Sequence, residues 1–132
     1  MPVAHADEAA RPTATVYKSP YCGCCEKWVE HMRRNGFAVI VENVSDFSTA
    51  KLIAGIPDDL AACHTASVAG YVVEGHVPAT DIDRLLAQRP TGTGLAVPGM
   101  PVGSPGMEQG NGSDAFDVVL FSGAARTIFA HY

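Results

Sequence analysis

The placement of the four cysteines is the feature that most limits how this chain can fold. Cys22, Cys24 and Cys25 lie within four consecutive residues, whereas Cys63 lies far downstream. This arrangement cannot staple distant loops together as the disulfide framework of a small exported domain does. A hydrophobic core must therefore hold the fold, and a chain of 132 residues that is 47% hydrophobic and 17% charged has the apolar material for one. The cysteines instead indicate a functional site.

Charge and hydropathy exclude two classes of partner. With 9 Lys and Arg against 14 Asp and Glu, the net charge is -5, so the excess of cations that binding to nucleic-acid phosphates requires is missing. No apolar run approaches the roughly 20 residues of a membrane-spanning helix, because Gly, Pro, His or an acid interrupts every long run. We expect neither nucleic-acid binding nor membrane insertion.

The first residues carry information about the compartment. Residues 1–12 show no hydrophobic periodicity and predict a flexible tail, which leaves residues 13–132 as one domain. Ala4-His5-Ala6 before Asp7 is typical of the small-x-small end of a secretory signal, and an arbitrary tail with the same residues is the alternative. The preferred interpretation is a signal-cleavage remnant, which predicts export from a bacterial cytoplasm.

Hydrophobic patterning predicts an α/β fold with a central mixed β-sheet flanked by helices. Runs of β-favouring residues predict strands at 13–18, 37–44, 68–74, 116–122 and 127–130. Apolar residues at helical spacing predict helices at about 21–35, from Asp46 or Ser48 to near Gly55, and at 78–88, with a short helical turn after Pro57. Residues 89–112 are rich in Gly and Pro and predict a long loop, which in a compact domain is usually functional or disordered.

Cys22 and Cys25 form a C-x-x-C pair between a predicted strand and the start of a predicted helix, which is the placement of thioredoxin-like domains. The N–H groups and partial positive charge of a helix N-terminus stabilise a thiolate, so cysteines there are good nucleophiles and good metal ligands. A dithiol redox couple needs only two sulfurs, and the third thiol, Cys24, would offer competing exchange reactions. Cys24 therefore favours metal binding, with a Cys22–Cys25 redox pair as the alternative.

The four thiols Cys22, Cys24, Cys25 and Cys63 together form a set of soft donors, which select Cu(I), zinc or iron–sulfur clusters. Zinc fits less well, because adjacent cysteines are awkward to aim at a single tetrahedral ion. Sulfurs that bridge several ions avoid this difficulty. The long loop adds the thioethers of Met100 and Met107, which favour copper over zinc, and its length predicts a lid over the site.

The histidines offer one further candidate ligand. His76 lies beside a predicted turn, where it is a candidate metal ligand, a group behind a ligand, or a hydrogen-bonded turn residue. His64 follows Cys63 directly and is interpreted as the neighbour of a ligand. We expect no part in the site from His5, His31 and His131. Asp81 and Asp83 are typical first-turn acids of a helix and show no partner for acid–base chemistry.

Several long motifs, in the same order, resemble the CopG-type copper-resistance proteins. The resemblance runs from about Thr13 to the C-terminus and shows no departure at the cysteines. It is carried by the segments Tyr21-Cys22-Gly23-Cys24-Cys25, Cys63-His64-Thr65-Ala66, 70–79, 94–101 and 103–107.

The resemblance implies a periplasmic protein of copper or silver resistance with a thioredoxin-like fold. It implies that Cys22, Cys24, Cys25 and Cys63 hold a multinuclear, thiolate-bridged copper cluster, and that the protein works with other periplasmic copper-handling proteins. It leaves open whether the role is redox conversion, transfer or sequestration of copper. Thioredoxins also place a proline before the strand that faces the C-x-x-C motif, and no proline immediately precedes Val68, which makes general disulfide exchange less favoured. An iron–sulfur module on the same cysteines is the remaining alternative.

Overall fold

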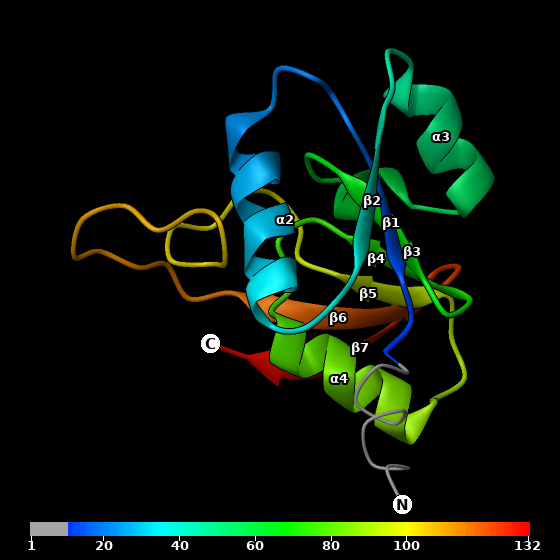
Figure 1. The fold of residues 1–132 in the computed structure, drawn as a ribbon. Coiled ribbons are helices and arrows are strands. Elements are labelled where there is room, and N and C mark those ends of the chain that lie inside the picture. The colour runs from blue at the N-terminus through cyan, green and yellow to red at the C-terminus, as the bar shows by residue number, and fades with distance from the viewer. Residues whose placement is uncertain (1–10) are drawn as a thin grey trace, which may run out of the picture.

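The computed structural model describes residues 11–132, without the side chains at positions 47–49 and 52. It contains a seven-stranded mixed sheet in the order β2-β1-β3-β4-β5-β6-β7, with helices packed on it (Figure 1). The strands are β1 (Ala14–Lys18), β2 (Val39–Asn43), β3 (Thr65–Val68), β4 (Tyr71–Glu74), β5 (Gly94–Ala96), β6 (Asp117–Ser122) and β7 (Ala125–His131). The helices are α2 (Gly23–Arg34), α3 (Phe47–Ala54), the 3-10 turn η1 (Asp58–Leu60) and α4 (Ala79–Gln88). Within residues 11–132, no helix is long and apolar enough to cross a membrane.

The helices divide between the two faces of the sheet. Alternate residues of a strand point to opposite faces, and in β4 Val73 belongs to one core cluster while Val72 packs against the other. The larger cluster joins β1, β3, β4 and β6 to Trp28 and Met32 of α2 and to Ile82 and Leu85 of α4. The smaller cluster contains Ile56 and Leu60, from the segment after α3, on the other face.

The predicted α/β class with a mixed central sheet is confirmed, and two elements differ from the prediction. The single strand expected at 68–74 is wrong: β3 and β4 form an antiparallel hairpin whose turn contains Ala69 and Gly70, both at positive φ. The apolar run through Val73 hides this turn, because Ala69 carries no turn signal. The loop expected at 89–112 contains β5, a short buried strand between β4 and β6.

The N-terminal prediction is largely untested. Residues 1–10, and with them the proposed cleavage remnant, lie outside the described part of the chain. Arg11, which was expected in the flexible tail, has its guanidinium 3.2 Å from the carboxylate of Asp83. The domain start at residue 13 and the thioredoxin-like description of the fold stay predictions.

Strand register brings four chain segments to one edge of the sheet. Tyr17 is paired with Thr65, Thr65 with Glu74, and Glu74 with Ala96. The end of β1, the start of β3 and the ends of β4 and β5 therefore lie side by side. The residues beyond this edge are Cys22 to Cys25, Cys63 and His64, His76, and the loop after β5, which projects beyond α2 in Figure 1. The topology assembles the predicted site from segments far apart in the sequence.

Gly94 allows the parallel pairing of β5 with β4. A Cβ atom added there would lie 1.7 Å from the carbonyl oxygen of Val72, its partner in the register. We predict that Gly94→Ala lowers the free energy of unfolding by about 3 kcal/mol or more, because backbone must move to relieve the overlap. Gly112→Ala is the control, since a Cβ there meets no atom within 4 Å, and we expect it to change stability by less than about 0.5 kcal/mol. Equal urea midpoints for the two variants would contradict this role of Gly94.

Candidate metal centre

The first turn of α2 presents three of the four cysteines. Cys22 is the N-cap of the helix, and its Sγ accepts a hydrogen bond of 3.2 Å from the backbone N–H of Cys25. The preceding loop is held by Lys18, which is 1% exposed and whose Nζ lies 2.9 Å from the Ser19 carbonyl oxygen and 2.8 Å from the Glu26 carboxylate. A buried ammonium that contacts both the loop and the first helical turn fixes one relative to the other.

The structure brings the four predicted cysteines together. Their sulfur atoms all lie within 4.8 Å of one another, although Cys63 comes from the segment before β3. Cys22 and Cys25 are joined by a disulfide, and the Sγ of Cys24 lies 3.5 Å from that of Cys22. Binding of metal by all four sulfurs therefore requires reduction of this disulfide by two electrons.

Cys63 is half-buried and has polar partners on one side. Its Sγ lies 3.0 Å from Nε2 of His76 and 3.4 Å from Nδ1 of His64. Burial, followed by the neighbouring Cys24, raises the pKa of the Cys63 thiol to about 12. In the metal-free protein Cys63 is therefore a neutral thiol at pH 7, and a metal ion that binds it displaces the proton.

The two histidines beside Cys63 are fully buried. His76 lies with Nδ1 2.6 Å from the carbonyl oxygen of Pro105, and the ring of His64 packs 4.5 Å from that of Trp28. Burial lowers the pKa of His76, and burial followed by repulsion from a protonated His76 lowers that of His64 to about 3. Both shifts favour the neutral ring at pH 7. His64 is the residue that the sequence interpretation missed as part of the site. Its one signal was its position directly after Cys63.

The two loop methionines have different surroundings. Sδ of Met100 lies 4.0 Å from Sγ of Cys24, and the side chain is 52% exposed. Among the described residues, no interaction joins the Met107 sulfur to a cysteine; its backbone N–H donates to the Ser104 carbonyl and its own carbonyl accepts from Gly103. The sulfur of Met100 thus borders that of Cys24, while the backbone of Met107 closes a turn of the loop, and a ligand role for Met107 stays a prediction.

The loop is also fitted closely to the helix that carries the cysteines. A Cβ atom added at Gly106 would lie 3.0 Å from the carbonyl oxygen of Cys24, from the backbone nitrogen of Trp28 and from Nδ1 of His76. Gly106 has φ +92°, in the left-handed region that favours glycine. The loop therefore packs against the first turn of α2, as a lid over the cysteines requires.

The other histidines and acids of the prediction have contacts of their own. Nε2 of His31 accepts a hydrogen bond of 3.0 Å from the backbone N–H of Ala79, which ties α2 to the start of α4. His131 pairs with Asp117, and Asp81 accepts a hydrogen bond of 2.6 Å from the hydroxyl of Tyr132. None of these contacts involves a cysteine, and His5 is outside the described residues.

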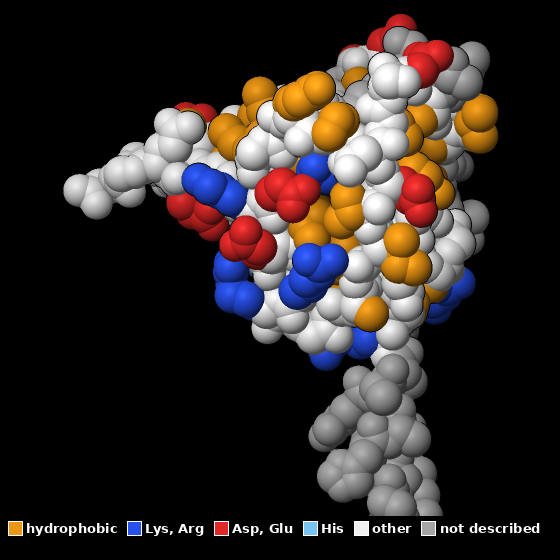
Figure 2. Space-filling model, turned by 45° about the horizontal axis from the view of Figure 1, so that its top comes forward, with side chains coloured by type: hydrophobic (Ala, Val, Ile, Leu, Met, Phe, Trp, Pro, Cys, Tyr) orange, Lys and Arg blue, Asp and Glu red, His pale blue; other side chains and the backbone are white. Residues whose placement is uncertain are grey.

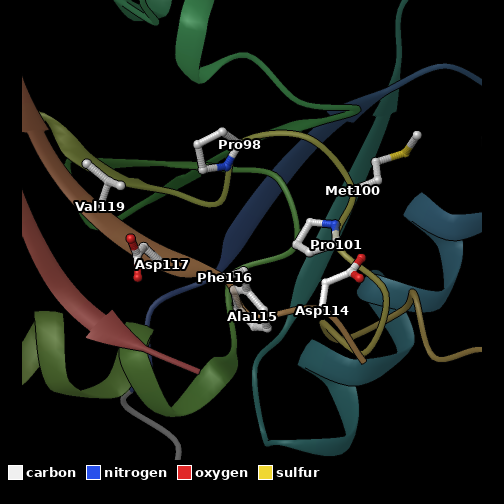
Figure 3. A pocket seen from close by; sticks show the side chains of 8 residues that line it. All are labelled: Pro98, Met100, Pro101, Asp114, Ala115, Phe116, Asp117 and Val119. Carbon is white, nitrogen blue, oxygen red and sulfur yellow. The ribbon is translucent and has the colours of Figure 1, made fainter. Parts of the chain in front are cut away.

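A cavity of about 550 Å³ borders the centre and shares Met100 with it (Figure 3). In Figure 3 the Met100 side chain extends away from Asp117 and Val119, toward the side on which α2 lies. The two acids of the cavity have partners, since Asp114 accepts from the Val102 N–H at 2.9 Å and Asp117 pairs with His131. We assign no ligand role to this cavity.

On the face drawn in Figure 2, hydrophobic side chains form separate groups between charged ones.

Two solved structures are similar to this chain over almost its whole length. They are named copper resistance protein CopG, form 2 and form 1, and both are 42% identical to the chain, cover 92% of it and are themselves 98% covered. Their TM-scores are 0.88 and 0.87. The chain belongs to the CopG family of copper resistance proteins. This confirms the resemblance found in the motifs.

A family model agrees with this assignment. The model described as "Protein of unknown function, DUF411" matches residues 60–107, which include Cys63, both buried histidines and both loop methionines. A comparison with curated protein sequences gives no match. The copper-resistance relatives and the cluster of cysteines and histidines fit copper binding by this member of the CopG family.

A buried carboxylate anchors the Cys63 segment in this CopG protein. Glu74 is fully buried, and it accepts hydrogen bonds from the backbone N–H of Ala62 at 2.7 Å and from the hydroxyl of Thr65 at 2.5 Å. It also pairs with the ammonium of Lys51 from α3. Ala62 and Thr65 flank Cys63 and His64, so a single carboxylate fixes both ends of the segment that carries them.

We predict that Glu74→Gln lowers the free energy of unfolding of the reduced, metal-free protein by about 2–3 kcal/mol. The variant loses the ion pair and turns an amide N–H toward groups that donate, while the 17% exposure of Lys51 moderates the cost. Urea denaturation measures the change. Glu30→Gln, at an exposed acid of α2, is the control and should stay within about 0.5 kcal/mol of the parent. Equal stability of both variants would show that Glu74 does not anchor the segment.

Proposed function

We propose that this protein is a periplasmic copper-binding protein of copper or silver resistance, which holds a thiolate-bridged, multinuclear Cu(I) cluster on Cys22, Cys24, Cys25 and Cys63. The observation that carries the proposal is the convergence of four sulfur atoms within 4.8 Å. Thiolate is the soft donor that selects Cu(I), and the names of the related structures place copper resistance in the family.

Charge balance favours several ions over one. Four thiolates around one Cu(I) ion would leave a net charge of about -3 in a half-buried site, which is costly to desolvate. Each further Cu(I) ion removes one negative charge, and sulfurs as close as those of Cys22 and Cys24, 3.5 Å apart, suit bridging. The N-terminus of α2 supplies partial positive charge to the thiolates of its first turn.

The disulfide between Cys22 and Cys25 favours a second candidate function, thiol–disulfide exchange. Cys22 would act as the nucleophile and Cys25 as the resolving thiol. Two features count against it. The strand that faces the motif begins at Thr65 rather than at the predicted Val68, and Cys63-His64 rather than a proline precede it. Cys24 also lies within reach of Cys22 and would compete in each exchange.

Met100 suggests how copper could pass between the proposed cluster and partner proteins. A half-exposed Met100 beside Cys24 gives copper a thioether on the solvent side of the thiolates. Thioethers bind Cu(I) as neutral ligands, so they assist transfer without adding charge. We infer that copper passes between this site and other periplasmic copper-handling proteins, with a change in copper oxidation state as a further proposed role.

We predict that Cys24→Ser lowers the number of Cu(I) ions bound per chain, because the variant loses a bridging sulfur. The measurement is an anaerobic Cu(I) titration of the fully reduced protein, with the free thiols counted at each point. The parent should bind more than one ion and lose all four reactive thiols. An unchanged stoichiometry in Cys24→Ser would contradict bridging. One weak ion or none in the parent, with Cys22 and Cys25 reforming their disulfide, would favour the exchange function instead.

We also predict that Met100→Ile speeds the release of Cu(I) to a chelator, because the thioether beside Cys24 is lost from the lid. Met107→Ile is the matched control, since it removes a thioether from the same loop at a residue whose described contacts are the backbone hydrogen bonds of the turn. Stopped-flow transfer of copper to a chromogenic chelator measures both rates. Equal rates for the parent and Met100→Ile would remove the methionine from the site.

A further inference from the structure

Cys63, His64 and His76 form a second set of donors that shares one sulfur with the four-cysteine set. Their ligand atoms all lie within 4.8 Å of one another. Bonds of about 2.3 Å to sulfur and about 2.0 Å to nitrogen around a tetrahedral ion separate the two donors by about 3.5 Å. The observed distances from Sγ of Cys63 are 3.0 Å to Nε2 of His76 and 3.4 Å to Nδ1 of His64. Small shifts would admit an ion.

His76 is oriented as a metal-binding histidine usually is. The carbonyl oxygen of Pro105 only accepts hydrogen bonds, so Nδ1 of His76, 2.6 Å away, carries the proton. In the neutral ring, Nε2 then presents its lone pair to Cys63. Donation of the remote ring N–H to a backbone carbonyl is the arrangement that fixes the tautomer of a metal-bound imidazole.

His64 has incomplete hydrogen bonding in the metal-free protein. It is 0% exposed, and its Nε2 has no hydrogen-bond partner among the described residues. If Nδ1 carries the proton, Nε2 is a buried acceptor without a donor. If Nε2 carries it, the lone pair of Nδ1 faces a sulfur whose proton is already directed at His76. An ion in place of the thiol proton uses the lone pairs of Nε2 of His76 and Nδ1 of His64, and Nε2 of His64 then carries the proton and stays without a partner among the described residues.

We propose that Cys63, His64 and His76 bind a single copper ion at a mixed sulfur and nitrogen site, and that this site persists when Cys22 and Cys25 form their disulfide. None of its donors belongs to that disulfide. One thiolate balances the charge of one Cu(I) ion, which suits a buried site. Two imidazoles with one thiolate also suit Cu(II), whereas an all-thiolate set favours Cu(I). The inference deepens the proposed copper function without depending on the cluster.

The test uses Co(II) as a spectroscopic probe that does not oxidise thiols. The protein is the Cys24→Ser variant with the Cys22–Cys25 disulfide formed, confirmed by mass spectrometry, so that Cys63 is the free thiol. We expect one Co(II) ion per chain, a thiolate-to-cobalt charge-transfer band and the visible bands of tetrahedral Co(II). His64→Gln and His76→Gln, each added to this variant, should weaken binding by about tenfold or more.

His131→Gln is the matched control, because His131 is exposed and pairs with Asp117 rather than with Cys63, and it should leave Co(II) binding unchanged. The proposal would be overturned if the Cys24→Ser protein did not bind Co(II), or if the His64 and His76 variants bound Co(II) as tightly as it does.

If a histidine variant fails to fold, ¹⁵N NMR of the Cys24→Ser protein tests the two ligands directly. Zn(II) should shift the ring nitrogens of His64 and His76 but not those of His131, and unshifted rings would overturn it. Failure of the four-cysteine cluster is detected separately, by Cu(I) titration of the reduced parent.

Discussion

The buried carboxylate of Glu74 is the contact on which the candidate metal centre most depends. Burial of an isolated charge costs several kcal/mol, and here a lysine, a hydroxyl and a backbone N–H offset that cost. Each of these donors belongs to a different part of the assembly: Lys51 to α3, Ala62 to the approach to Cys63, and Thr65 to the start of β3. The carboxylate is therefore satisfied only when these parts are in place, which makes the position of Cys63 a condition of the fold.

The buried ammonium of Lys18 has a similar role for the other cysteine segment. Lys18 ends β1 as Glu74 ends β4, and its ammonium contacts the Ser19 carbonyl and the Glu26 carboxylate at the start of α2. The sheet thus ends in one buried cation next to the Cys22 to Cys25 turn and one buried anion next to the Cys63 segment. Directional hydrogen bonds to charged groups are stronger than neutral ones, so both cysteine segments are held before metal binds.

Residue types and their spacing predicted more of the candidate site than the expected backbone conformation did. The four cysteines, Met100 and the helix after Cys22 followed from residue types and spacing, which act within a few residues. The β3–β4 turn escaped prediction because Ala69 adopts a positive φ that alanine seldom takes. The contact of His64 with Cys63 depends on strand register and on the packing of Trp28, neither of which spacing reveals. Met107 carried the same chemical signal as Met100, and it is the path of the loop that brings Sδ of Met100 to 4.0 Å from Sγ of Cys24.

Cys63 belongs to both donor sets, and this sharing links their behaviour. In the proposed cluster, reduced Cys22 and Cys25 supply the additional thiolates that several Cu(I) ions need for charge balance. Oxidation of the pair removes two thiolates and leaves Cys63 facing two neutral imidazoles that burial keeps unprotonated. If both proposals hold, the oxidation state of Cys22 and Cys25 sets the copper capacity of the centre, and with it the preference between an all-sulfur site for Cu(I) and a mixed site that also accepts Cu(II).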